Sequence, residues 1–291
     1  MNPQREYARR VGRARPPAAV DAIENRERQF ICSAPATTPL AGDLLLDRGP
    51  FQIRLAQGQR RSASDMLVQK MYSRRGYDTG KTGTTSHGRR SITVQACHGP
   101  TVFGTLNAGF DCGTGLASDV LYRREIDAYR RPDGRVSEFT RLAVEPEHGS
   151  KDVLGALFHL TQLVAVYLDA TDMFIEVNPR HVAFYRRMLH FQPAGEEKLC
   201  GRVNAPAILM HLEVAHMRKR IALYGGRRDD SDRSLYPYYC SPQEEADVLE
   251  RFAALNVERW LSIVPRHSAG TRPSSAATES VIGRDASGLA A

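Results

Sequence analysis

A glutamate and an arginine, Glu138 and Arg141, have the types and spacing best suited to bind a ligand. Both lie in the apolar run from Val136 to Val144, whose length is typical of a β-strand. Phe139 and Leu142 are three residues apart in this run, so a regular pleat would turn them to opposite faces. A β-bulge between them would restore one apolar face and bring Glu138 and Arg141 to the same side.

Two interpretations of this pair stay open on the residues alone. A carboxylate and a guanidinium at this end of the strand would lie at the mouth of a strand-to-helix turn, where open α/β sheets bind ligands. Glu138 and Arg141 could instead form an ion pair at the strand end with a purely structural role.

The elements that position the pair form a strand, helix, strand, helix unit. The second strand is predicted over Met173–Val177, and an amphipathic helix over Arg180–Leu189. Between the strands, a long apolar helix runs from Ser150, its N-cap, to about Asp169. A helix that is apolar on most sides is typical of a right-handed crossover between two parallel strands.

The start of this helix also permits two interpretations. Its free N–H groups and dipole favour an anion, and Gly149, Gly155 and Ala156 would let a phosphate approach, with Lys151 adding a positive charge. The same small residues would also let a helix pack closely on a sheet.

The remaining elements follow the same patterns. A strand is predicted over 51–55, a helix over 62–75, a hairpin of strands 91–97 and 101–111, a helix over 116–131, and last strands at Phe191 and 208–214. Gly104 inside the hairpin indicates a bulge or a close approach. The helix over 116–131 either lines a pocket or simply covers the sheet.

Composition divides the chain into four parts. Residues 1–48 are rich in Arg, Pro and Ala and predict a mostly disordered arm, and residues 266–291 predict a disordered tail. Residues 49–215 form the main domain, and 216–265 a helical extension with a basic cluster at Arg218–Arg220, Arg227 and Arg228. Its helix begins with a capping box at Ser241 and Glu244 and runs to about Ile263.

The net charge of +7 over 291 residues indicates an acidic partner. Nucleic acid is not expected, because no DNA- or RNA-binding motif occurs. The five cysteines are scattered and the histidines lack metal-ligand spacing, so neither a disulfide framework nor a metal site is predicted. We expect a cytoplasmic chain with no membrane span.

Three stretches carry a resemblance to a known family. They are GLASDVLYRREIDAYRR, RVSEFTRLAVEP, and FIEVNPRHVAFYRRMLHFQPAGEE with RVNAPAILMHLEV. They resemble the FeeM-type long-chain N-acyl amino acid synthases of the GNAT acyltransferase superfamily, over roughly residues 51–214. Glu138-x-x-Arg141 is also similar to a strand motif of the acyl-homoserine-lactone synthases, which share that fold.

The resemblance implies a fold and a reaction. The fold would be α+β, with a GNAT-like mixed, mostly antiparallel sheet around a central parallel βαβ unit flanked by helices. The enzyme would move a long-chain acyl group from an acyl carrier protein to the amine of an amino acid, with no tightly bound cofactor. The usual Q/R-x-x-G-x-G/A loop is replaced by residues 147–152, which favours an acyl-phosphopantetheine donor on an acidic carrier over acyl-CoA.

Roles for individual residues follow from the resemblance. Glu138 would be the general base, Arg141 would bind the amino acid's carboxylate or hold Glu138, and Tyr185 would protonate the leaving thiolate. Tyr185 could also be a packed aromatic residue, and Asn178 caps the last helix. The donor would bind at Ala143, Val144, His148, Gly149, Ser150, Lys151 and Asn178, and the acyl chain at Leu121, Ile126, Tyr129 and Phe139.

Two other functions remain open. One is an acyltransferase of the same fold that uses acyl-CoA on a small amine or makes a lactone signal. The other is a non-catalytic module that binds an acyl carrier, in which Glu138→Ala would leave binding unchanged.

Overall fold

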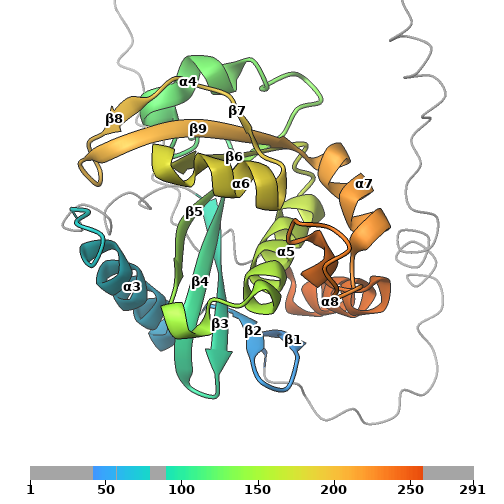
Figure 1. Ribbon diagram of the computed structural model, residues 1–291. Helices are drawn as coiled ribbons and strands as arrows, with labels where there is room; N and C mark the ends of the chain where they lie inside the picture. Colours follow the sequence, from blue (N-terminus) through green and yellow to red (C-terminus); the bar gives the residue numbers. More distant parts are fainter. Residues whose placement is uncertain (1–41, 57, 79–89, 258–291) are drawn as a thin grey trace, which may run out of the picture.

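The computed structural model describes residues 42–56, 58–78 and 90–257. Figure 1 shows a twisted sheet with helices on both faces. The strands are β1 (Leu44–Asp47), β2 (Gln52–Leu55), β3 (Arg90–His98), β4 (Thr101–Phe110), β5 (Val136–Val144), β6 (Asp172–Val177), β7 (Gln192–Pro193), β8 (Lys198–Cys200) and β9 (Ala205–Glu213). The helices are α3 (Gly58–Ser73), α4 (Asp119–Asp127), α5 (Lys151–Tyr167), α6 (Val182–Leu189), α7 (Val214–Tyr224) and α8 (Pro242–Leu255), with 3-10 turns η1 (Pro146–His148), η2 (Pro179–His181) and η3 (Tyr236–Tyr238).

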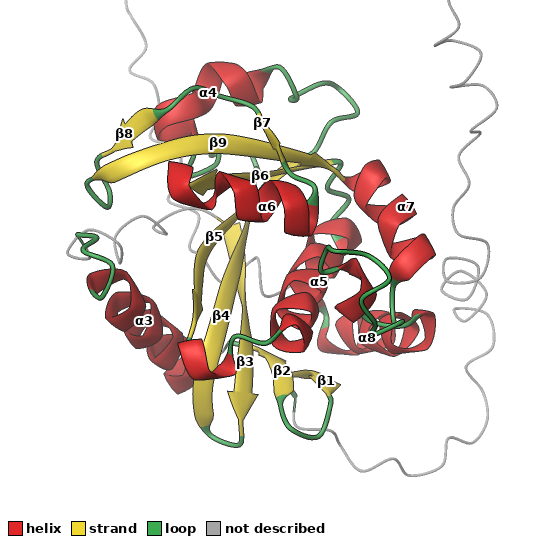
Figure 2. Ribbon diagram, viewed as in Figure 1, coloured by secondary structure: helices red, strands yellow, loops and turns green. Residues whose placement is uncertain are grey.

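The sheet order confirms the predicted fold class. The strands run β1-β2-β3-β4-β5-β6-β9-β7, and β8 pairs with the outer part of β9. Among these described strands, β5 and β6 are the one parallel pair, and the others are antiparallel. The crossover between β5 and β6 is α5, so the predicted βαβ unit is the centre of the sheet (Figure 2).

Helix α5 forms where the sequence predicts it. The hydroxyl of Ser150 accepts a hydrogen bond from the backbone N–H of Val153, which confirms the N-cap. Residues from Val153 to Ala165 are almost all buried against β2, β3 and β4. Helix α3 packs on the opposite side, over β4 and β5 (Figure 1).

The predicted hairpin is β3 and β4, joined by Gly99 and Pro100. Gly99 has a φ of 55°, the left-handed region that favours glycine. A bulge lies next to Gly104, where β4 holds one more residue than β3. A side chain at Gly104 would come 3.0 Å from the Ala96 Cβ, so the predicted close approach is also present.

The C-terminal part shares the core of the sheet. Tyr236, Tyr239 and Phe252 are fully buried in the same hydrophobic cluster as α5 and the central strands. The capping box at Ser241 and Glu244 begins α8, as predicted. This extension therefore completes the fold on the outer side of α5.

One buried arginine joins the two ends of the described chain. Arg48 follows β1, and its side chain is 3% exposed. Its guanidinium contacts Asp152 in the first turn of α5, the carbonyl of Tyr238, and Glu244 at the start of α8. Three segments far apart in sequence are thus held at one point.

Several predicted boundaries differ from the structure. Leu44–Asp47 form β1 inside the stretch assigned to the N-terminal arm, because Leu45 and Leu46 are buried beside β2. Helix α4 is shorter than predicted, since residues 116–118 form a turn before it. The helix predicted to run to about Ile263 ends at Leu255, because Asn256 adopts a left-handed conformation with a φ of 48°. Residues 1–41 of the arm, residues 258–263 and the tail lie outside the described residues. No described helix has the length and apolar character needed to cross a membrane.

Candidate active site

The two parallel strands separate at the centre of the sheet. β5 and β6 pair only from Val136 to Phe139 and from Asp172 to Ile175. Beyond these residues both strands continue without hydrogen bonds between them. A cavity of about 540 Å³ fills this split. Its lining comes from both strands and from α3, α5, α6 and the β8–β9 hairpin, and includes Tyr72, Arg75, Phe139, Thr140, Leu142, Leu154, Phe158, Ile175, Phe184, Cys200 and Ala207.

The predicted bulge is confirmed in β5. Thr140 and Ala143 pair with Asn107 and Thr105, so two residues of β5 lie opposite one residue of β4. The first of these two is Arg141, whose φ of 61° is unusual for a residue with a side chain.

The bulge brings Glu138 and Arg141 to the wall of the same cavity, as predicted, but not into contact. The Arg141 guanidinium pairs with Asp65 on α3. No described hydrogen bond or ion pair joins it to Glu138. The interpretation of an ion pair between these two residues therefore receives no support.

Glu138 is a buried carboxylate with three hydrogen-bond donors around it. Its Oε1 accepts from the backbone N–H of Ala117 at 2.6 Å. Its Oε2 accepts from the N–H of Ser118 at 2.9 Å and from the Ser118 hydroxyl at 2.7 Å. Gly109 on β4 leaves room for it, because an added Cβ there would lie 3.2 Å from Oε1. Glu138 thus fixes the turn that precedes α4.

Tyr185 lies on α6 with its ring against Phe158 and Phe191. Burial raises the pKa of its hydroxyl above the ordinary value, and the nearby Tyr72 adds to this. Burial also raises the pKa of Tyr72, to about 12. No described residue forms a hydrogen bond with the Tyr185 hydroxyl, and Tyr185 lines the cavity. A neutral phenol is therefore available to a bound molecule.

A second carboxylate in the cavity was missed from the sequence. Glu176 on β6 lines the cavity, and its Oε2 contacts Arg202 and lies 3.7 Å from the Cys200 Sγ. Burial raises the pKa of the Glu176 carboxyl, while Arg202 lowers it and the charge of Glu138 raises it further. A signal was present, because Glu176 is the charged residue within the apolar run Met173–Val177.

The predicted donor-binding residues divide into two groups. Ala143, Val144, Gly149 and Asn178 line the cavity. His148, Ser150 and Lys151 do not: the first packs against Phe103, the second caps α5, and the third pairs with Asp230 at 2.5 Å. Asn178 accepts a hydrogen bond from the backbone N–H of Arg180, so it caps η2, the turn that leads into α6.

The predicted acyl-binding residues also divide. Phe139 lines the cavity. Leu121 and Ile126 on α4, and Tyr129 just after it, pack instead in a separate cluster with Phe174 and other residues on the side of the sheet that α4 covers. In this structure α4 covers the sheet, which was the alternative interpretation of this segment.

Among the described residues, no group of three His, Cys, Asp or Glu side chains could hold a metal ion.

Comparison with known proteins decides the family. The model of the N-acyl amino acid synthase FeeM matches residues 63–213, more than half of the chain. The chain belongs to the FeeM family of N-acyl amino acid synthases. It is therefore an N-acyltransferase on the GNAT fold. No curated protein sequence gives a significant match.

A solved structure of FeeM agrees with this family, and two other structures are similar to the chain at lower identity. FeeM from uncultured soil microbes is 28% identical, with a TM-score of 0.53, over 57% of this chain and 97% of that one. An N-acetyltransferase from Staphylococcus aureus is 13% identical over 57% of this chain and 98% of its own, with a TM-score of 0.41. A CoA-dependent acyl-homoserine lactone synthase is 13% identical over 56% and 69%, with a TM-score of 0.34.

Proposed function

We propose that this member of the FeeM family transfers a long-chain acyl group from an acyl carrier protein to the amine of a free amino acid. The observation that carries the proposal is the split between β5 and β6, which opens a cavity with apolar walls and charged groups at Glu138, Glu176 and Arg202. The apolar wall suits an acyl chain, and the charged groups suit a zwitterionic acceptor.

The split also suits an extended donor arm. Beyond Phe139, β5 pairs with no described strand on its β6 side, so its backbone groups there are available to a ligand. A phosphopantetheine arm is extended and contains amide groups, so it can pair with such an edge as an added strand would. Ala143, Val144, Gly149 and Asn178 lie along this path and are the donor-binding residues that we retain.

The loop before α5 supports a carrier protein over acyl-CoA as donor. A diphosphate bound there would need positive charge. Lys151 is the one lysine or arginine in residues 145–152, and its ammonium pairs with Asp230. Glu147 adds negative charge to the same loop, and the nearby Asp152 carboxylate pairs with Arg48. A phosphopantetheine on a carrier protein has one phosphate group instead of a diphosphate, so its binding needs less positive charge.

In the proposed reaction the amine nitrogen attacks the thioester carbonyl. The C–N bond forms, the C–S bond breaks, and the thiolate leaves. A carboxylate, Glu138 or Glu176, takes one proton from the ammonium before attack, and Tyr185 delivers a proton to the thiolate. A guanidinium of the cavity wall, Arg141 or Arg202, offers positive charge to the acceptor's carboxylate, and the backbone N–H groups freed at the bulge can bind the oxyanion.

The acyl chain has an apolar wall within the same cavity. Phe139, Leu154, Phe158 and Phe184 supply this wall from β5, α5 and α6. A long chain lying along these residues would reach the carbonyl position at the split without displacing α4.

The test is synthesis by the purified protein. The protein is incubated with a mixture of the protein amino acids and one long-chain acyl group, carried either by an acyl carrier protein or by CoA. Mass spectrometry then identifies N-acyl amino acids and names the acceptor. We expect product from the carrier donor at a higher kcat/KM. If product forms from acyl-CoA alone, the proposal that a carrier protein is the donor is wrong. If folded protein gives no product from either donor, the proposed synthase function is wrong.

A further inference from the structure

We propose that Glu176 and Arg202 form the binding site for the charged head of the amino acid acceptor, and that Glu176, rather than Glu138, takes the amine proton. This inference rests on the proposed synthase function. It assigns both residues a direct contact with the substrate: the Glu176 carboxylate with the ammonium group, and the Arg202 guanidinium with the carboxylate.

Glu176 is a carboxylate with one satisfied oxygen and one unsatisfied oxygen. Its side chain is 10% exposed. Oε2 is held by Arg202 and the Cys200 thiol. Oε1 is buried and has no hydrogen-bond donor among the residues that the structure describes. An unpaired oxygen of a buried charged group costs free energy until a donor reaches it, so this atom is prepared for a bound N–H group.

Glu138 differs from Glu176 in this respect. Both of its oxygens already accept hydrogen bonds from Ala117 and Ser118, so neither is left open to a bound N–H group. Taking a proton would weaken at least one of these bonds. Glu138 is therefore better suited to position the turn before α4, and its charge raises the proton affinity of Glu176.

The pKa of Glu176 also supports the assignment of Glu176, rather than Glu138, as the base. Burial raises it above the ordinary value of 4.5, and the Glu138 charge adds to the effect against the opposing Arg202. A base works best when its pKa approaches the working pH. Glu176 is ionised above this raised pKa and is a stronger base than an exposed glutamate.

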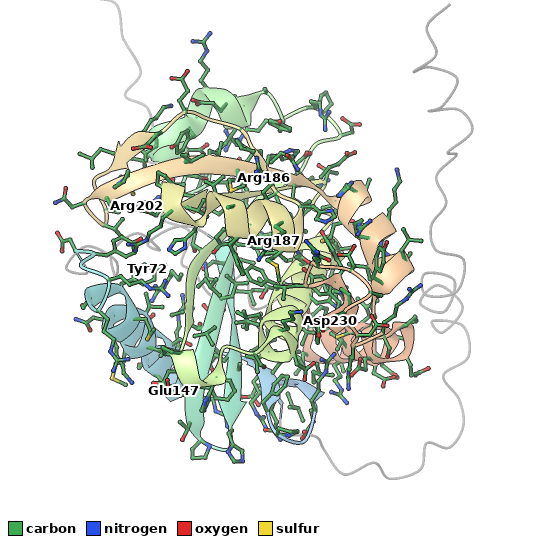
Figure 3. The ribbon with its side chains drawn as sticks, viewed as in Figure 1. Tyr72, Glu147, Arg186, Arg187, Arg202 and Asp230 are labelled. Atoms are coloured by element: carbon green, nitrogen blue, oxygen red, sulfur yellow. The ribbon has the colours of Figure 1, made fainter. Side chains whose placement is uncertain are left out.

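Arg202 keeps donors available for a carboxylate. One terminal nitrogen of its guanidinium contacts Glu176, and the Cys200 side chain also interacts with the guanidinium. A guanidinium has five N–H groups, so donors remain for a ligand. The side chain is 21% exposed and lines the cavity. Figure 3 shows Arg202 by the β8–β9 hairpin, on the same side of the molecule as Tyr72 of α3. A guanidinium binds a carboxylate through two N–H groups, which fits an α-amino acid.

The proton balance of the step is complete. One proton of the acceptor's ammonium passes to Glu176 Oε1 and then to solvent when the product leaves. The neutral amine forms the C–N bond, and the C–S bond breaks. Tyr185 gives its proton to the thiolate. The second proton, on the attacking nitrogen, leaves the intermediate and reprotonates Tyr185. The products are the amide, the thiol and one proton.

The first experiment compares Glu176→Gln with Glu138→Gln, and uses Glu125→Gln as a matched control. Glu125 on α4 pairs with Lys198 on β8 and does not line the cavity, so its replacement removes an ion-paired carboxylate elsewhere. Each protein is first shown to be folded by thermal melting. The kcat at saturating amino acid is then measured against pH.

We expect Glu176→Gln to lower kcat about 10²–10⁴-fold and to remove the fall in kcat at acid pH, whose midpoint in wild type lies above 4.5. Glu138→Gln should keep that acid limb, and Glu125→Gln should match wild type. The proposal is overturned if Glu176→Gln keeps the limb and a kcat within about threefold of wild type. An inactive wild type would instead reject the synthase function itself.

The second experiment tests Arg202 with two acceptors: the amino acid that wild type prefers and its methyl ester, which lacks the negative charge. We expect wild type to favour the free acid, and Arg202→Gln to lose at least about tenfold of this preference through the KM of the acid. Arg141→Gln is the comparison, because Arg141 also lines the cavity. If Arg141→Gln loses the preference and Arg202→Gln keeps it, the carboxylate site belongs to Arg141 and the proposal fails.

Discussion

Glu138→Gln is a substitution of nearly equal size that should still destabilise the fold. The two backbone N–H groups of Ala117 and Ser118 point at different oxygens of the Glu138 carboxylate. A glutamine offers one acceptor oxygen and one NH₂ donor. With its oxygen at the Oε2 position, the side chain keeps both bonds to Ser118 and turns its NH₂ group against the N–H of Ala117.

The size of the effect follows from the bonds that are lost. Glu138→Gln loses one hydrogen bond to a charged acceptor and leaves the buried N–H of Ala117 unpaired, which costs about 2 kcal/mol of unfolding free energy. Glu138→Ala leaves both backbone N–H groups without a partner and should cost about 4 kcal/mol. For a domain of this size, the glutamine variant should melt about 4–8 °C below wild type.

Urea unfolding followed by circular dichroism measures these differences. Glu125→Gln is again the control, since its partly exposed ion pair with Lys198 should contribute less than about 1 kcal/mol. If Glu138→Ala is no less stable than this control, the argument that Glu138 holds the turn before α4 is refuted.

Three further predictions concern single contacts. Gly155→Ala should cost about 1–3 kcal/mol in urea unfolding, because the new Cβ would lie 2.8 Å from the Cβ of Tyr238; an unchanged midpoint would show that η3 can move away. Arg48→Met should cost about 1–3 kcal/mol, because Asp152 and Glu244 lose their hydrogen bonds to Arg48 while Glu244 keeps its pair with Arg228, and a midpoint equal to wild type would contradict this. Tyr185→Phe should lower kcat about 10²-fold with little change in the amino acid KM in steady-state assays, and full activity would leave Tyr185 as a packed ring.

Local patterns predicted the centre of the fold. The strands β5 and β6, the helix between them and its cap at Ser150 all follow from hydrophobic spacing and one capping residue. The bulge in β5 was also predictable, because Phe139 and Leu142 can share a face only if a residue is inserted between them. These features depend on residues close together in sequence.

The rest of the site depends on contacts between distant segments. Lys151 was predicted to bind phosphate, but its ammonium group pairs with the Asp230 carboxylate, 79 residues away, which balances its charge. An amphipathic helix such as α4 buries its apolar face against another part of the protein. The spacing of its apolar residues does not predict whether Leu121 lines a cavity or packs against the sheet. The surroundings of Glu176 also come from residues distant in sequence, because its carboxylate contacts Arg202 and Cys200.

The position of Arg48 has a consequence for how the chain folds during synthesis. Its partners Asp152 and Glu244 lie 104 and 196 residues further along. The strands of the central sheet can pair as they emerge, but the outer face of α5 stays uncovered until the segment that carries Tyr239 and Phe252 has been made. Contacts of such long sequence separation form slowly, and the nascent chain meanwhile exposes apolar surface. We therefore expect the last fifty or so described residues to decide whether a newly made molecule folds or is captured by chaperones.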